Sequence, residues 1–183
     1  MGHWESTYGR GANYILNLPP SANGLIEPAL VAAARAFRAE RTRRYGPAAL
    51  LASAQGSVSA ATAADGGNTL VLQLPGDGHV VDRILLAETA LATLGQQVLR
   101  YTLEAQLAGA GDEWVALRLS DNPTACQLHA YTHCGGETIG THHLDAGWAQ
   151  TAPLAAVRLT LLQTLSPGAR PQISMKAYCV GCQ

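Results

Sequence analysis

The sequence predicts a mainly β protein, with an antiparallel β-sandwich or jelly roll over residues 47–183 and one β/α unit before it over residues 1–46. Two observations predict this fold. One apolar run and one helix-like run precede Gly46, whereas short segments with a period of two, separated by glycine, proline and aspartate, follow it. A chain of 183 residues, 48% of them hydrophobic, can form one ordinary domain or one small domain plus a fragment.

The first predicted element is a buried strand over Ala12 to Leu18, a mostly apolar run of the kind found in parallel sheets. Pro19-Pro20 ends it because proline has no N–H to donate to a sheet. Asn23-Gly24 then predicts a turn.

The second predicted element is an amphipathic helix from Pro28, which suits the first helical position, to about Arg44. Its apolar positions recur at the helical spacing, at Leu30, Ala34 and Phe37, and Gly46 is expected to stop it. A single strand–loop–helix unit cannot bury its own faces, so it predicts further neighbours.

The sandwich is predicted from alternating apolar residues. This period of two predicts strands at residues 70–74, 99–106, 115–119, 157–161 and 173–177. Residues 47–68, rich in alanine, serine and glycine, are expected to form a linker and a first edge strand.

Composition argues against two classes of partner. The net charge is −1 and no basic face is visible, so no nucleic acid is expected. No apolar run approaches the roughly 18 residues of a membrane span, so no membrane span is expected. The first residues have neither a basic nor an apolar region, so we expect no signal peptide in this chain.

The N-terminal run is similar to a known family. Gly9-Arg10-Gly11-Ala12-Asn13-Tyr14-Ile15-Leu16-Asn17-Leu18-Pro19-Pro20, followed by Asn23-Gly24-Leu25-Ile26, resembles the last barrel strand and following loop of α-L-fucosidases of glycoside hydrolase family 29. Ile84 to Glu104 resembles the Glu…Gly-Gln-x-Val…Tyr-x-x-Glu pattern of their C-terminal sandwich. That sandwich is in turn similar to galactose-binding, discoidin-like domains.

Shorter matches occur further along in the order that the family shows. They are Glu113-Trp114, Thr138-Ile139-Gly140, Val157-Arg158-Leu159 and Pro171-Gln172-Ile173-Ser174. An extra segment between Leu119 and Gly136 departs from the family pattern.

The resemblance implies the C-terminal part of an α-L-fucosidase, with the last β/α unit of a (β/α)8 barrel before the sandwich. The intact parent would remove terminal α-L-fucose from glycans, with retention through two carboxyl groups. Both carboxylates would lie upstream, so no catalytic residue, metal or cofactor is assigned here. The implied partners are fucosylated glycans and the missing barrel portion, in an extracellular, lysosomal or periplasm-like compartment.

Two residues are candidates for substrate binding. Asn17 would stand at the C-terminal end of the barrel strand, the end that faces the active site in such barrels. Trp4 could stack on a sugar. Glu5, the one carboxylate before the strand, is most simply a solvated loop residue.

The four cysteines Cys126, Cys134, Cys179 and Cys182 permit two disulfides. A local Cys126–Cys134 disulfide competes with a zinc site that would add His129 and His133. Cys179 and Cys182 have the spacing of a redox pair, but without a βαβ context a terminal disulfide is the simpler interpretation.

Two rival functions remain open: a stand-alone discoidin-like carbohydrate-binding module, and an appendage that only packs against a barrel. The orphan β/α unit argues against the binding module. His142-His143 is interpreted as the start of a surface strand.

Overall fold

The computed structural model describes residues 1–60, 67–117, 138–146 and 152–179. The helical elements are α1 (Gly2–Thr7), the 3-10 turn η1 (Tyr8–Arg10), α2 (Pro28–Tyr45) and α3 (Leu91–Leu94). The strands are β1 (Leu50–Ser57), β2 (Thr69–Gln73), β3 (Arg83–Glu88), β4 (Val98–Leu107), β5 (Trp114–Ala116), β6 (His143–Ala146), β7 (Leu154–Thr164) and β8 (Gln172–Tyr178).

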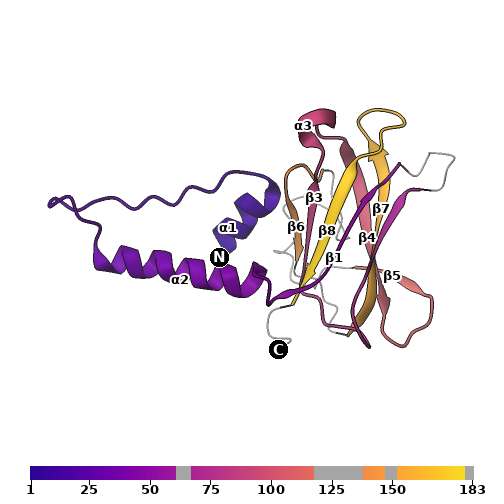
Figure 1. The fold of residues 1–183 in the computed structure, drawn as a ribbon, viewed down its shortest axis with the longest axis horizontal. Helices are drawn as coiled ribbons and strands as arrows, with labels where there is room; N and C mark the ends of the chain where they lie inside the picture. The colour runs from indigo at the N-terminus through magenta and orange to yellow at the C-terminus, as the bar shows by residue number, and fades with distance from the viewer. Residues whose placement is uncertain (61–66, 118–137, 147–151, 180–183) are drawn as a thin grey trace.

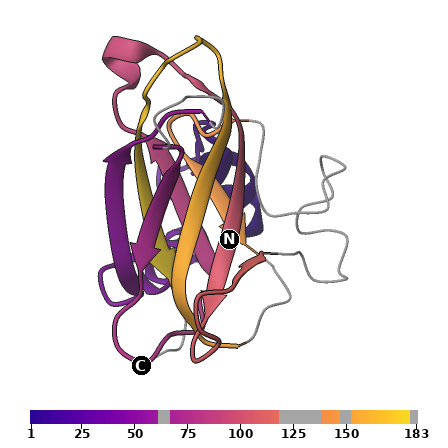
Figure 2. The same cartoon turned by 90° about the vertical axis from the view of Figure 1, so that its right-hand side faces the viewer.

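The strands form two sheets, with strand orders β1-β8-β3-β6 and β2-β7-β4-β5. All pairings between the described strands are antiparallel. The two sheets face each other, and the helical N-terminal segment lies on one side of them (Figures 1 and 2). The prediction of a mainly β chain with antiparallel sheets is confirmed.

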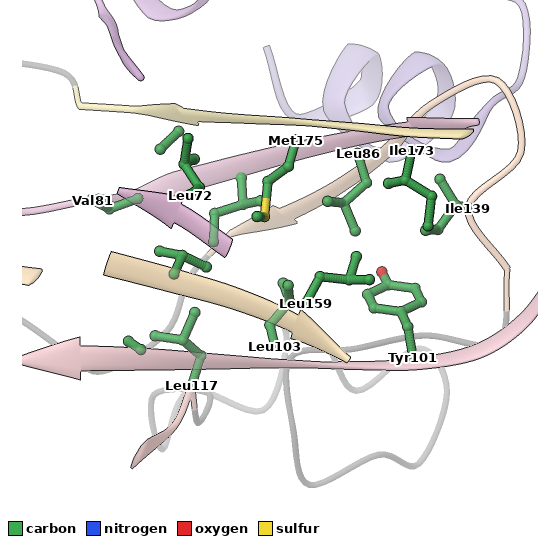
Figure 3. Packing of buried hydrophobic residues seen from close by; sticks show 14 of the residues in the cluster. Leu72, Val81, Leu86, Tyr101, Leu103, Leu117, Ile139, Leu159, Ile173 and Met175 are labelled. Carbon is green, nitrogen blue, oxygen red and sulfur yellow. The ribbon is translucent and has the colours of Figure 1, made fainter. Parts of the chain in front are cut away.

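The core lies between the two sheets. Leu86, Ile173 and Met175 point from one sheet toward Leu103 and Leu159 of the other (Figure 3). The buried cluster comprises Val58, Leu72, Leu74, Val81, Ile84, Leu86, Val98, Tyr101, Leu103, Ala105, Leu117, Ile139, Leu154, Val157, Leu159, Leu161, Ile173, Met175 and Ala177. Alternate residues of β3, β4 and β8 therefore face inward, as a half-buried antiparallel sheet requires.

A buried carboxylate fastens one end of the sandwich. Glu88, at the end of β3, is 4% exposed. It accepts hydrogen bonds from the backbone N–H groups of Gln97 at 2.8 Å and Gly140 at 3.0 Å, and a longer one from Val98 at 3.4 Å. One side chain thus holds the start of β4 and the loop before β6 against the end of β3.

The predicted strand over Ala12 to Leu18 is wrong. The backbone there forms no strand, and the side chain of Ile15 is 88% exposed. The segment runs beside α2, away from the sandwich (Figure 1). A strand needs a neighbour to pair its N–H and C=O groups, and no described strand lies along this segment.

The predicted helix is confirmed as α2. It has Pro28 at its first position and is followed by Gly46, as the sequence indicates. No residue of α2 is fully buried, although the Phe37 ring stacks on Tyr14 at 5.8 Å between centroids. Within the described residues, no helix is both long enough and apolar enough to cross a membrane.

Candidate functional site

A concave feature lies where the N-terminal segment meets the sheet β1-β8-β3-β6. It is a pocket of about 510 Å³. Its lining comes from α1 and η1, the end of α2, and strands β3, β6 and β8. The lining residues are Trp4, Tyr8, Gly9, Tyr14, Arg41, Thr42, Tyr45, Gly46, Pro47, Leu85, Leu144 and Tyr178.

Aromatic rings pack together where α1, η1 and the end of α2 meet the sheet, a region that we call the junction. Trp4, only 9% exposed, stacks on Tyr8 with centroids 4.8 Å apart and contacts Tyr45 at 5.0 Å. Tyr45 meets the edge of Tyr178 at 5.5 Å. The close approach depends on Gly9, where a Cβ atom would lie 2.9 Å from Cβ of Leu144. These contacts place α1 directly against the sandwich.

Glu5 is the polar anchor of the junction. Its Oε1 accepts hydrogen bonds from the Tyr45 hydroxyl at 2.8 Å and from Nη1 of Arg44 at 3.0 Å. Nε of Arg83 on β3 lies 3.8 Å from the same oxygen. Glu5 is therefore a half-buried tie between α1, α2 and the sheet, and not the solvated loop residue that the sequence suggests.

Burial changes the acidity of the junction. It raises the pKa of the Tyr45 phenol, and the hydrogen bond to the Glu5 carboxylate raises it further. Burial likewise raises the pKa of Tyr178, and nearby Tyr8 adds to the effect. Both phenols therefore remain neutral at ordinary pH, and that of Tyr45 donates to Glu5.

A second polar contact joins η1 to β6. The Tyr8 hydroxyl lies 3.1 Å from Nε2 of His142, and Nη1 of Arg10 lies 2.9 Å from Nε2 of His143. His143 begins β6, so the expected strand start is confirmed, but the residue is only 7% exposed and does not lie on the surface. The sequence offers no local signal for this contact, because its partners are 133 and 134 residues apart.

The described lining of the pocket contains no pair of carboxyl groups of the kind that a retaining glycosidase uses. That chemistry requires two carboxyl groups about 5–5.5 Å apart. None of the described residues that line this pocket is an aspartate or glutamate, and the adjacent Glu5 is engaged by Tyr45, Arg44 and Arg83. Within the described ranges, no group of three or more histidine, cysteine, aspartate or glutamate residues could hold a metal ion.

The two substrate-binding candidates occupy different places. Trp4 lines the pocket, with its ring between Tyr8 and Tyr45. Asn17 is exposed on the extended segment and is not among the lining residues. The structure does not bring them together in this pocket, and a role for either in sugar binding stays a prediction.

The cysteine hypotheses fall largely on residues outside those described. These are Cys126, Cys134 and Cys182, together with His129 and His133. Cys179 is described; it is buried at the end of β8, where its N–H donates to the carbonyl of Ala49. The cysteine pairing and the zinc alternative stay predictions.

Comparison with known proteins identifies the fold. No protein-family model matches the sequence, and no curated protein is similar to it. Among solved structures, a proposed α-L-fucosidase from Bacteroides thetaiotaomicron matches 98% of this chain and 33% of its own, with a TM-score of 0.71 and 23% identity. A family 29 fucosidase from Ruminococcus gnavus, in complex with fucose, matches 99% of this chain and 36% of its own, with a TM-score of 0.68 and 17% identity.

The chain thus has the fold of one part of these fucosidases. A third structure, a proposed α-L-fucosidase from Bacteroides ovatus, matches 98% of this chain and 26% of its own, with a TM-score of 0.70 and 19% identity. The chain therefore spans only about a third of the length of the structures that it matches. Because the matches cover nearly all of this chain, they include both the N-terminal segment and the sandwich, and the sequence resemblance is confirmed for the fold.

Proposed function

We propose that this chain is the C-terminal part of a family 29 α-L-fucosidase, whose intact form hydrolyses terminal α-L-fucose from glycans with retention. The observation that carries the proposal is the structural match over 98% of this chain to a fucosidase-like structure of which it covers 33%. Such a match, with part of a larger protein, supports a portion of an enzyme over a complete binding module. The Gly9 to Pro20 motif and the exposed Ile15 agree with a segment that needs further neighbours.

In this proposal the catalytic carboxylates lie outside the chain. The barrel portion would supply both the nucleophile and the acid/base. The residues described here would then fix the last barrel elements to the sandwich, through the Trp4 ring cluster and the Glu5 tie. The chain's contribution is positioning, without a chemical step of its own.

The first prediction is that the purified chain does not turn over p-nitrophenyl α-L-fucoside above the buffer rate. Enzymes lower reaction barriers by roughly 8–23 kcal/mol when all of their catalytic groups are in place. The two catalytic carboxyl groups are expected outside this chain, so that lowering should be lost. The measurement is release of nitrophenol at high protein concentration, with the Glu5→Gln variant as a contamination control. Turnover that disappears in Glu5→Gln would contradict the proposal.

The rival function, a stand-alone carbohydrate-binding module, is supported by one observation. The pocket is lined by aromatic rings, the surface on which sugars commonly stack. Calorimetric titration of the full chain with fucose and fucosylated oligosaccharides distinguishes a binding module from a fucosidase portion. Saturable binding that the Tyr14→Ala variant abolishes would favour the module, whereas no binding supports a fucosidase portion.

We further propose an extracellular, lysosomal or periplasm-like compartment for the parent enzyme. The family resemblance and the even number of cysteines support it. The second prediction is that Cys126 and Cys134 are joined by a disulfide in material from an oxidising compartment. Peptide mapping without reductant measures this, and free thiols at both positions would contradict it.

A further inference from the structure

The pocket at the junction contains a tyrosine hydroxyl that the described chain does not use. The Tyr178 side chain is only 4% exposed, and no described residue hydrogen-bonds to its hydroxyl. Among the described residues, no fully buried side-chain oxygen or nitrogen lacks a hydrogen-bond partner, so this hydroxyl must reach open space. Tyr178 lines the pocket, and the pocket is therefore the space that its hydroxyl reaches. A ligand in the pocket would give this hydroxyl a partner.

The pocket also contains a cation that is open to a ligand. Among its described lining residues, only Arg41 is charged at neutral pH. Its neighbours Arg43 and Arg44 both pair with the Glu40 carboxylate. Arg41 is exposed and has no ion-pair partner among the residues that the structure describes. Its guanidinium is therefore available, and a guanidinium binds an oxyanion through two parallel hydrogen bonds.

The charges around the pocket favour a ligand with a single negative charge. The carboxylates beside the pocket, Glu5 and Glu40, are each engaged by two arginines. The C-terminal end of α2 carries a partial negative charge, which Arg43 and Arg44 in its last turn offset. The positive charge of Arg41 is left to match a monoanion such as a carboxylate or a sulfate ester. A phosphate monoester, with close to two negative charges at neutral pH, matches one guanidinium less well.

The rest of the lining suits the ring of a sugar. Five of the described lining residues are aromatic, and aromatic rings are a surface on which sugars commonly stack. The hydroxyls of Tyr178 and Thr42 can exchange hydrogen bonds with sugar hydroxyls. Because the pKa of Tyr178 is raised, its phenol stays neutral and does not repel an anion. The volume of about 510 Å³ lies within the range of about 300–1,000 Å³ that small-molecule sites occupy.

We propose that this pocket binds a pyranose that carries one negative charge, on a carboxylate or a sulfate ester. Arg41 holds the oxyanion, the Tyr178 hydroxyl donates a hydrogen bond to the ligand, and the aromatic rings pack on the sugar. The site performs no chemical step. It does not rest on the fucosidase proposal, which concerns a neutral sugar and carboxylates outside this chain, so either proposal can fail alone.

Calorimetric titration of the full chain at constant ionic strength tests the site. The probes are methyl β-D-glucuronide, D-glucose 6-sulfate, methyl β-D-glucoside and sodium acetate. We expect saturable binding of the glucuronide, the sulfate ester or both, and the pattern identifies the oxyanion. The uncharged glucoside should bind at least about tenfold more weakly, because it lacks the charge-assisted hydrogen bonds to Arg41. Acetate should also bind at least about tenfold more weakly, because it has no ring to pack on the aromatic side chains.

Two variants locate the binding in this pocket. Arg41→Met should lower the affinity for the charged sugars at least about tenfold, to that of the glucoside. Tyr178→Phe keeps the ring but removes the hydroxyl, and should lower the affinity about threefold. Arg38→Met, at an exposed arginine of the same helix outside the pocket lining, is the matched control and should bind as wild type.

Protection of β7 from hydrogen exchange reports whether each variant is folded. The proposal is overturned if neither charged sugar binds saturably, or if the glucoside or acetate binds as tightly as the charged sugars. It is also overturned if folded Arg41→Met or folded Tyr178→Phe binds as wild type does. If Tyr178→Phe does not fold, Arg41→Met decides, because Arg41 is exposed and lies outside the core between the sheets.

Discussion

At the scale of single residues, the acidic and aromatic positions of the family-like pattern have structural partners. Glu88 accepts hydrogen bonds from backbone N–H groups at the start of β4. Tyr101 donates to Asp145, and Glu104 pairs with Arg158 across β4 and β7. These residues connect strands, which explains how they characterise a sandwich without belonging to an active site.

Glu88 supports the third prediction. Glu88→Ala removes the acceptor for buried N–H groups, and a single buried donor left unsatisfied costs roughly 1–3 kcal/mol. We expect the free energy of unfolding to fall by at least about 2 kcal/mol. Glu88→Gln keeps one carbonyl oxygen and should lose less. Urea unfolding of the full chain measures both changes.

The matched control for this prediction is Glu113→Gln, at an exposed glutamate in the turn before β5. It should change stability by less than about 0.5 kcal/mol, as is usual for surface substitutions. Glu88→Ala with wild-type stability would show that the buried carboxylate does not support the sandwich.

At the scale of elements, the period of two predicted strands correctly where one face of the strand is buried and the other face is more exposed. Leu159 and Leu161 of β7 are fully buried, and the intervening Thr160 is half-buried. The alternation of burial along a strand therefore appears in the sequence as an alternation of apolar and polar residues. The same signal located β2, β4, β5, β7 and β8 to within a few residues, and the expected edge strand is β1.

The apolar run before Pro19 gave a wrong strand prediction, because strand formation also depends on a partner. Ala12 to Leu18 carries a strand-like apolar run, yet Ile15 is exposed and the backbone is unpaired with any described strand. Apolar composition can indicate that a segment would be buried in a larger assembly. It cannot supply the neighbouring strand that provides the hydrogen bonds.

The sequence indicated the start of β6 but not its burial, and it missed α1, for a different reason. His143 and Asp145 are polar residues at buried positions of β6, and their partners Arg10 and Tyr101 are distant in sequence. The helix α1 has no side-chain cap. Its place is set by Trp4 packing on Tyr8 and Tyr45, which no local pattern encodes.

At the scale of the whole molecule, the N-terminal segment divides into two parts. Residues 2–10 pack on the sandwich through the pocket and the histidine contacts. The stretch from η1 to α2 runs beside α2, away from the sandwich, as Figure 1 shows. It displays four large apolar side chains: Ile15 at 88% exposure, Leu25 at 71%, Leu16 at 46% and Ile26 at 42%.

This exposed stretch supports the fourth prediction, that the full chain self-associates. Unpaired backbone and exposed apolar side chains promote association, and the barrel that would cover them is expected elsewhere. Light scattering should show a mass that rises with concentration. The double variant Ile15→Lys, Leu25→Lys should be monomeric, whereas Leu165→Lys, at a site 61% exposed on the sandwich, should associate as wild type does.

The sandwich should remain the stable cooperative unit when the N-terminal segment is removed. A chain that begins at Pro47 loses the cover over Leu144 and Tyr178, so its stability should fall. Among the described residues, the cluster between the sheets and the side chains packed against it include none before Leu51, so cooperative unfolding should persist. Urea unfolding and hydrogen exchange at equal concentration compare the two chains. A monomeric full chain with strongly protected residues 12–18, or loss of cooperative unfolding on removal of residues 1–46, would show that the N-terminal segment is an integral part of the domain.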